Sequence, residues 1–247
     1  MKDRFGEQAG LYAQFRPSYP ETLYDFVLDH CADRDRAWDC GTGNGQAALA
    51  LAPHFSEVCA TDLNERQLAH APRHSNICYL QCPAEQSPFP DRHFDLTVVA
   101  QALHWFDFGR FFPEVHRTAR AGALLAVWGY DLLRIRPEID AAIDRYYRNV
   151  IGPFWDAERR HVETHYRSIS IPFPEIPVDR AFSMRYEWSL SQLEGYLQTW
   201  SAYRNYLREM EKDPLPALLA EIRAAWPDGK ELCPVCFPVF LRLFRPR

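Results

Sequence analysis

The stretch Asp39-Cys40-Gly41-Thr42-Gly43-Asn44-Gly45 decides the fold of this chain. It follows the short apolar run 37–40, which predicts a buried strand, and it precedes a helical pattern over 46–52. Glycine allows positive φ and lets ligand atoms approach the backbone where a Cβ would collide. A glycine-rich turn between a strand and a helix is where doubly wound α/β sheets bind nucleotides or nucleosides.

Strands and helices alternate on both sides of this turn through the first half of the chain. Strands separated by helices at this spacing imply right-handed crossovers and a parallel sheet that is covered on both faces. The further strands are predicted at 57–61, 77–80, 94–99 and 123–128, and the other helices at 24–31, 65–71 and 111–119.

The second half of the chain has a different character. Helices rich in Arg, Tyr and Trp are predicted to form an insertion over the sheet, and the proline cluster at 171–177 ends helicity. The last two strands are expected to make a hairpin-like edge. These helices are predicted at 138–148, 154–166, 191–210 and 216–226, and the two strands at 181–188 and 235–244. Ser189 or Ser191 is the predicted N-cap of the helix at 191–210.

Composition excludes several classes of protein. Among the 247 residues no window approaches about 18 uncharged apolar residues, and the first ten residues lack an apolar secretion core, so we expect neither a membrane protein nor a secreted precursor. A net charge of -5 lacks the basic footprint of a nucleic-acid binder. Small substrates are therefore favoured.

The seven cysteines form an odd, scattered set, which indicates reduced thiols and a cytoplasmic location. Cys233-Pro-Val-Cys236 has the spacing of half a zinc site, but no second pair stands at matching spacing. We expect two small apolar residues entering a strand, and no metal.

An acidic residue supports the prediction that the glycine turn binds a nucleotide or nucleoside. Asp62 ends the next predicted strand, 21 residues after Gly41, where a carboxylate can accept hydrogen bonds from both hydroxyls of a ribose. A dinucleotide fingerprint starting at Gly41 would need glycine or alanine at position 46, where Gln46 stands. An NAD(P)-dependent oxidoreductase is therefore disfavoured, although it stays open as an alternative.

The pattern D-x-G-x-G-x-G after a strand resembles the S-adenosyl-L-methionine loop of class I methyltransferases. Ala84-Glu85, Pro88-Phe89-Pro90 and Phe94-Asp95-Leu96 are similar to a stretch of the methyltransferase type 11 group. The segments 101–106 and 15–20 look most like the subgroup of trans-aconitate methyltransferase-like proteins. Together these segments cover roughly residues 5 to 130.

The resemblance implies a set of cofactor-binding residues. The three glycines would line the methionine moiety, the acid would hold the ribose, and two segments would flank the adenine. The backbone at the end of the fourth strand would face the methionine part, and two N-terminal side chains would close over the cofactor. In chain order these residues are Tyr12, Arg16, Asp39, Gly41, Gly43, Gly45, Asp62, Leu63, Ala84, Glu85 and Gln101.

Methyl transfer from a sulfonium mainly requires alignment of acceptor, carbon and sulfur in a water-poor pocket. His104 is the candidate base, and its alternative role is to position the loop by hydrogen bonding. Trp128 and Tyr130 could face the acceptor or the sulfonium through cation–π attraction, or pack in the core. Trp105 and Tyr203 are further candidates for substrate binding, with packing as the competing account for Trp105.

We therefore expect a Rossmann-like doubly wound α/β fold, a seven-stranded mostly parallel sheet with helical additions over the active site. One domain would comprise a cofactor-binding core (1–130), a helical insertion and substrate cap (131–210), and a last helix and strand (211–247). The expected activity is S-adenosylmethionine-dependent methylation of a small molecule, at a carboxylate or hydroxyl oxygen. A nucleic-acid or protein methyltransferase, and a cofactor-binding protein without catalysis, remain alternatives. The sequence gives no oligomeric state.

Overall fold

One mixed sheet organises the protein, which is described over residues 17–227 and 229–247 by a computed structural model. The strands run in the order β3-β2-β1-β4-β5-β8-β6, with β7 paired to β8 beside this row. The neighbours from β3 to β5 are parallel, whereas β8 is antiparallel to its partners. The strands are β1 (Arg36–Cys40), β2 (Glu57–Asp62), β3 (Ile77–Gln81), β4 (Phe94–Ala100), β5 (Ala119–Tyr130), β6 (Glu175–Ile176), β7 (Phe182–Trp188) and β8 (Cys233–Phe244). The predicted doubly wound, mostly parallel sheet is confirmed, and the two-residue β6 brings the described strands to eight.

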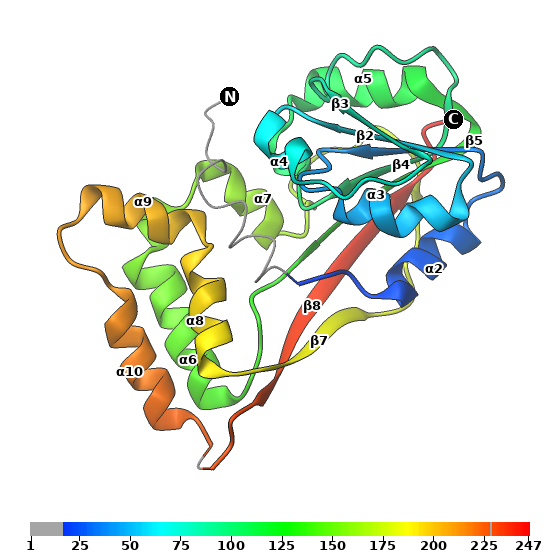
Figure 1. The fold of residues 1–247 in the computed structure, drawn as a ribbon. Coiled ribbons are helices and arrows are strands. Elements are labelled where there is room, and N and C mark those ends of the chain that lie inside the picture. Colours follow the sequence, from blue (N-terminus) through cyan, green and yellow to red (C-terminus); the bar gives the residue numbers. More distant parts are fainter. Residues whose placement is uncertain (1–16, 228) are drawn as a thin grey trace.

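Helices cover both faces of the sheet (Figure 1). On one face Leu23 and Val27 pack with the buried side chains of β1 and β4, and on the other face Phe111 and Val115 pack around Trp38. The helices of this half are α2 (Glu21–Asp29), α3 (Gln46–Leu51), α4 (Glu65–Ala69) and α5 (Phe108–Thr118), with the 3₁₀ turns η2 (Ala52–His54) and η3 (Leu103–Trp105).

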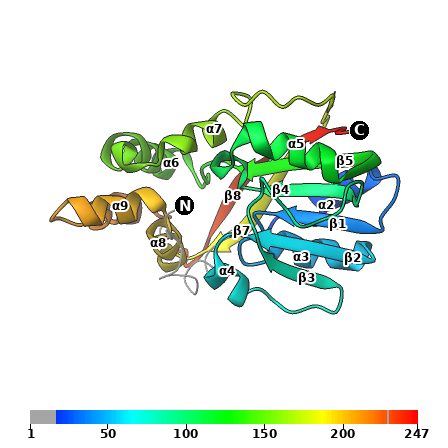
Figure 2. The ribbon, with the colours of Figure 1, turned by 90° about the horizontal axis from the view of Figure 1, so that it is seen from above.

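A second group of helices, which we call the cap, stands beside the sheet (Figures 1 and 2). The final helix, α10, packs against α6. The cap therefore combines helices that come before β7 in the sequence with helices that come after it. Its helices are α6 (Pro137–Arg145), α7 (Arg160–Glu163), α8 (Leu190–Gln198), α9 (Ser201–Glu209) and α10 (Leu215–Ala225), with the short turns η4 (Tyr146–Val150), η5 (Gly152–Phe154) and η6 (Ala157–Arg159).

Two predicted cap helices were wrong in extent. The helix predicted at 154–166 is divided into η5, η6 and α7, because Trp155 and Asp156 have extended backbone. The helix predicted at 191–210 is divided into α8 and α9. There the Thr199 hydroxyl donates to the Tyr196 carbonyl at 2.6 Å, and Trp200 turns to extended backbone and becomes buried in the cap.

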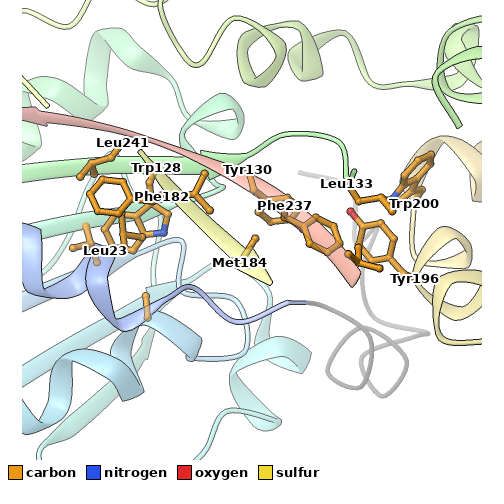
Figure 3. Packing of buried hydrophobic residues seen from close by; sticks show 14 of the residues in the cluster. Leu23, Trp128, Tyr130, Leu133, Phe182, Met184, Tyr196, Trp200, Phe237 and Leu241 are labelled. Carbon is orange, nitrogen blue, oxygen red and sulfur yellow. The ribbon is translucent and has the colours of Figure 1, made fainter. Parts of the chain in front are cut away.

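The long strand β8 joins the cap to the sheet. Its residues Val239–Phe244 pair with β5, and Cys233–Val239 pair with β7, so the predicted antiparallel pairing of the last two strands is confirmed. A continuous row of buried side chains follows it, from Trp128 and Phe182 at the sheet to Phe237 and then Trp200 in the cap (Figure 3). Cap and sheet therefore share one hydrophobic core.

Candidate functional site

A cavity of about 830 Å³ opens where the parallel strands end. Because β1, β2 and β4 run parallel, their carboxyl ends meet at one edge of the sheet. The loops after these strands bring many of the predicted site residues together. Gly41, Gly43, Asp62, Leu63, Ala84, Glu85, Gln101, Trp105 and Tyr130 all line the cavity.

The glycine turn packs closely against neighbouring residues. Gly41 has φ +73°, and a Cβ there would lie 2.7 Å from the Ala102 Cβ. Gly45 has φ +82°, and a Cβ there would overlap the Tyr79 hydroxyl. The Gly41 amide donates to the Thr61 carbonyl at 2.8 Å, which ties the turn to β2. The turn therefore requires glycine for both conformation and space.

Asp62 is oriented by the backbone on both sides of it. Its Oδ2 accepts from the Gly43 amide and its Oδ1 from the Asn64 amide, each at 2.8 Å. Burial raises the pKa of this carboxyl, whereas the amide hydrogen bonds oppose that rise. Each oxygen keeps a second lone pair, so the carboxylate can accept from two hydroxyls in the cavity. The next residue, Leu63, is 39% exposed and presents an apolar surface to the same space.

Asp39 lies under the turn and does not line the cavity. Its side chain is fully buried, and its Oδ2 accepts from the Thr42 hydroxyl and from the Ala48 amide. Its Oδ1 has no hydrogen-bond partner among the described residues. Burial raises the pKa of the Asp39 carboxyl to about 7. The geometry supports a role in holding the glycine turn from below, instead of direct contact with a ligand.

The loop 101–107, which we call the η3 wall, forms one side of the cavity. Gln101 starts it in the left-handed region at φ +56°, and the Gln101 side-chain carbonyl accepts from the Tyr130 amide at 2.9 Å. Gly129 makes this contact possible, because a Cβ at Gly129 would overlap the Gln101 Oε1 atom. Within the wall Trp105 faces the cavity, and η3 contacts η6 of the cap.

His104 belongs to the η3 wall, but its side chain is buried and does not line the cavity. Its Nδ1 is hydrogen-bonded to the Tyr166 hydroxyl at 3.0 Å. Burial, followed by the charges of Arg159 and His161, lowers the pKa of His104 to about 3. The ring is therefore neutral near pH 7, and its geometry supports the loop-positioning alternative over the role of a base. The sequence did not single out Tyr166, since no periodicity distinguishes it within the Tyr-rich insertion.

Three further predicted residues, Gly45, Trp128 and Tyr203, do not line the cavity. Trp128 is fully buried, with the rings of Tyr19 and Tyr24 packed edge-on at 5.7 and 5.8 Å. The Tyr203 hydroxyl donates to Asp213 at 3.1 Å inside the cap. Tyr12 and Arg16 lie outside the described residues.

Several cavity residues were missed by the sequence analysis. They come from segments that only the fold brings together, namely Pro17, Tyr19, Gln46, Arg66, Asp107 and, from η6, Glu158. Gln46 is the one with a sequence signal, as it occupies the position where a dinucleotide fingerprint requires glycine or alanine. Its Nε2 donates to the Pro17 carbonyl at 3.2 Å, so its side chain lies across the start of α3.

Neither a metal cluster nor a membrane-spanning helix is found among the described residues. No group of three or more His, Cys, Asp or Glu side chains there is arranged to hold a metal ion. Within the same residues, no helix combines the length and the apolar character needed to cross a membrane.

Comparison with known proteins gives a consistent set of relatives. A family model described as a methyltransferase domain matches residues 38–127. A protein of Dictyostelium discoideum named as a methyltransferase is 33% identical over 98% of this chain and 94% of its own length. One from Saccharomyces cerevisiae, named as an S-adenosylmethionine-dependent methyltransferase, is 26% identical over 82% of each chain.

Solved structures agree with this set. The structure of a protein from Anaeromyxobacter dehalogenans, named as a type II methyltransferase, is similar to this chain with a TM-score of 0.87 and 39% identity, covering 94% of this chain and 98% of that one. A protein from Bacillus halodurans that is named as a methyltransferase, at 18% identity and a TM-score of 0.53, shares the fold alone; the match covers 92% of this chain and all of that one.

Proposed function

Because this chain belongs to the methyltransferase family, we propose that it transfers the methyl group of S-adenosyl-L-methionine to an oxygen of a small molecule. The observation that carries the proposal is the cavity at the carboxyl ends of the strands, which the glycine turn and Asp62 line together with the aromatic residues Trp105 and Tyr130. The narrower likeness to trans-aconitate methyltransferase-like proteins stays a prediction.

The residues that line the cavity fit S-adenosyl-L-methionine, the cofactor of this family. A nucleoside needs a carboxylate for its ribose and apolar surface for its base, which Asp62 and Leu63 provide. Gly41 and Gly43 line the cavity with backbone that carries no Cβ, which suits the close approach of the methionine part. Ala84 and Glu85 line the side expected for the adenine edge. When bound, the sulfonium supplies an already activated methyl group.

The chain contributes binding, orientation and exclusion of water in this proposal. Tyr19, Trp105 and Tyr130 present aromatic surface at the cavity, and the rings of Tyr19 and Tyr130 lie 6.2 Å apart. Aromatic walls suit a small planar or partly apolar acceptor. A carboxylate acceptor is already ionised and needs no base, whereas a hydroxyl acceptor must lose a proton. The buried, neutral His104 favours an acceptor that does not depend on this histidine as base.

An NAD(P)-dependent oxidoreductase is the second candidate, and the site gives it less support. A pyrophosphate is normally held by the open N-terminus of the helix after the glycine turn. Here α3 has six residues, and the Gln46 side chain at its start is engaged with the Pro17 carbonyl. A cofactor-binding protein without catalysis would have the same site. Only a measurement of turnover distinguishes it from an enzyme.

Calorimetric titration with S-adenosylhomocysteine, and with NAD in parallel, tests the proposal. Asp62→Ala should weaken binding of S-adenosylhomocysteine by about 1–3 kcal/mol, because ribose hydroxyls lose a charged acceptor. Asp29→Ala, at the exposed end of α2, is the matched control and should bind like the wild type. Binding of NAD alone, or equal affinities of wild type and Asp62→Ala, would contradict the assignment.

Turnover is tested next with a panel of carboxylic acids and phenols. The formation of S-adenosylhomocysteine is followed by mass spectrometry with each compound as the acceptor. Acceptor-dependent product formation is the expected outcome. Cofactor binding without product from any member of the panel would favour the non-catalytic alternative.

A further inference from the structure

Two consecutive residues after α7 have an unusual backbone conformation. His165 and Tyr166 both lie in the left-handed region, at φ +52° and +58°. For residues with a Cβ this conformation is costly and persists only where the surroundings enforce it. The Tyr166 amide donates to the His161 carbonyl, and Arg242 of β8 donates to the Tyr166 carbonyl, both at 2.7 Å. The strained pair is therefore held between the cap and β8.

His165 contacts the segment that follows β5. Its Nε2 donates to the Asp131 carboxylate, with 2.9 Å to Oδ1 and 3.1 Å to Oδ2. The ring stacks on Phe240 with centroids 4.7 Å apart and planes 19° apart. Asp131 directly follows Tyr130, which lines the cavity. The hydrogen bond therefore fixes the chain next to one cavity wall.

Tyr166 contacts the other wall. Its side chain is fully buried, and its hydroxyl is hydrogen-bonded to Nδ1 of His104 at 3.0 Å. The His104 ring lies 4.6 Å from the ring of Trp105, which lines the cavity. A buried hydrogen bond of this kind holds both partners, because an unpaired polar atom there would lack water as a substitute.

We propose that His165 and Tyr166 are positioning residues that set the acceptor side of the cavity. Tyr166 acts through His104 on Trp105, and His165 acts through Asp131 on Tyr130, so one strained dipeptide of the insertion fixes two walls that come from different strands. The cofactor side, built from the glycine turn and Asp62, has no hydrogen bond to either residue within the described part of the chain. The assignment of these walls to the acceptor rests on the proposed function; their mechanical coupling does not.

Hydrogen–deuterium exchange on the free protein tests the coupling. Tyr166→Phe keeps the ring and removes the hydroxyl, so the amides of residues 102–107 should exchange about tenfold faster, while affinity for S-adenosylhomocysteine stays within twofold. Tyr203→Phe is the matched control, as it removes another cap hydroxyl, bonded to Asp213 at 3.1 Å, and should leave residues 102–107 unchanged. Unchanged exchange in Tyr166→Phe, or equal acceleration along the whole chain, would overturn the proposal.

A second variant covers the case in which Tyr166→Phe folds poorly. His104→Phe removes the same hydrogen bond from the other side. The variant that carries both substitutions should accelerate amide exchange of residues 102–107 no more than either single variant. Additive acceleration would show that the two residues act separately and would contradict the coupling. Because neither measurement needs methyl transfer, failure of the proposed function would not imitate failure of this inference.

The acceptor side is tested with a carboxylic acid or phenol that the panel identifies as a substrate. Tyr166→Phe should raise KM for that acceptor about fivefold to tenfold and leave KM for S-adenosylmethionine unchanged. A purely structural role would lower thermal stability without this split between the two substrates, and an unchanged acceptor KM would overturn the positioning role.

Discussion

Gly129 is needed for its lack of a side chain, although its φ is not in the left-handed region. A Cβ there would overlap the Gln101 Oε1 atom and lie 2.5 Å from the Phe240 ring. Gly129→Ala should therefore displace Gln101 and lower the free energy of unfolding by about 1–3 kcal/mol, the usual cost of overpacking. Urea unfolding measures this change. Gly109→Ala in α5, whose Cβ would come no closer than 3.4 Å to another residue, should show no such loss.

Asp39 makes the stability of the protein depend on pH. Burial raises its pKa in the folded state to about 7, compared with about 3.9 in an unfolded chain. The folded state therefore favours the protonated form, and this contribution to stability is complete below pH 4 and is lost as the pH rises through 7. Asp39→Asn cannot ionise. As the pH rises from 4 to 8, the free energy of unfolding of Asp39→Asn should therefore increase relative to that of the wild type by on the order of 2–4 kcal/mol.

Chemical denaturation of both proteins at pH 4 and pH 8 checks this prediction. The quantity to compare is the change in unfolding free energy between the two pH values, because the substitution itself alters the hydrogen bonds of the glycine turn equally at both. Parallel pH profiles of wild type and variant would show that Asp39 is ionised normally in the folded protein.

Several of the predicted site residues that line the cavity stand at or near the ends of strands. Gly41, Gly43 and Asp62 line the cavity because each ends a strand or follows shortly after one, and the place where a strand ends is a local property. Tyr166 and Glu158 come from segments that fold back onto the sheet, so their position depends on packing over long sequence separations. No pattern in the sequence carries that information.

Among the elements, the start of α8 is fixed by a capping box. The Ser189 hydroxyl accepts from the Gln192 amide at 3.3 Å, and the Gln192 side chain accepts from the Ser189 amide at 2.8 Å. Of the two serines that the sequence offered as caps, Ser189 is confirmed. Ser189→Ala should destabilise the protein by about 1 kcal/mol in urea unfolding. Ser191→Ala removes a hydroxyl that caps no amide and should cost clearly less; equal losses would contradict the box.

The elements of the sheet half were predicted more accurately than those of the cap. Each predicted strand from β1 to β5 exists, because buried parallel strands are short apolar runs that end at glycine or polar residues. The break between α8 and α9 was missed, since neither Thr199 nor Trp200 forbids a helix. Packing of Trp200 against Tyr147 and Trp155, at centroid distances of 5.7 and 5.8 Å, overrides the continuous helical pattern.

For the whole molecule, cofactor binding and folding are linked. A ligand that binds only the folded state adds about 2.7 kcal/mol of stability when present at 100 times its Kd. S-adenosylhomocysteine should therefore raise the unfolding free energy of the wild type by about this amount. At the same concentration Asp62→Ala should gain less, in proportion to its weaker binding, whereas NAD should add nothing. A shift with NAD equal to that with S-adenosylhomocysteine would indicate a different cofactor.

The place of β8 in the sheet also governs the order in which the protein can fold. β8 follows every other strand along the chain, yet β5, β6 and β7 all pair with it. During synthesis β5 therefore emerges with one edge exposed, and that edge stays unpaired until more than a hundred further residues have been made. Such contacts across long sequence separations slow folding, and an unpaired edge favours aggregation. The nascent chain should thus be most vulnerable in the interval before its last strand emerges.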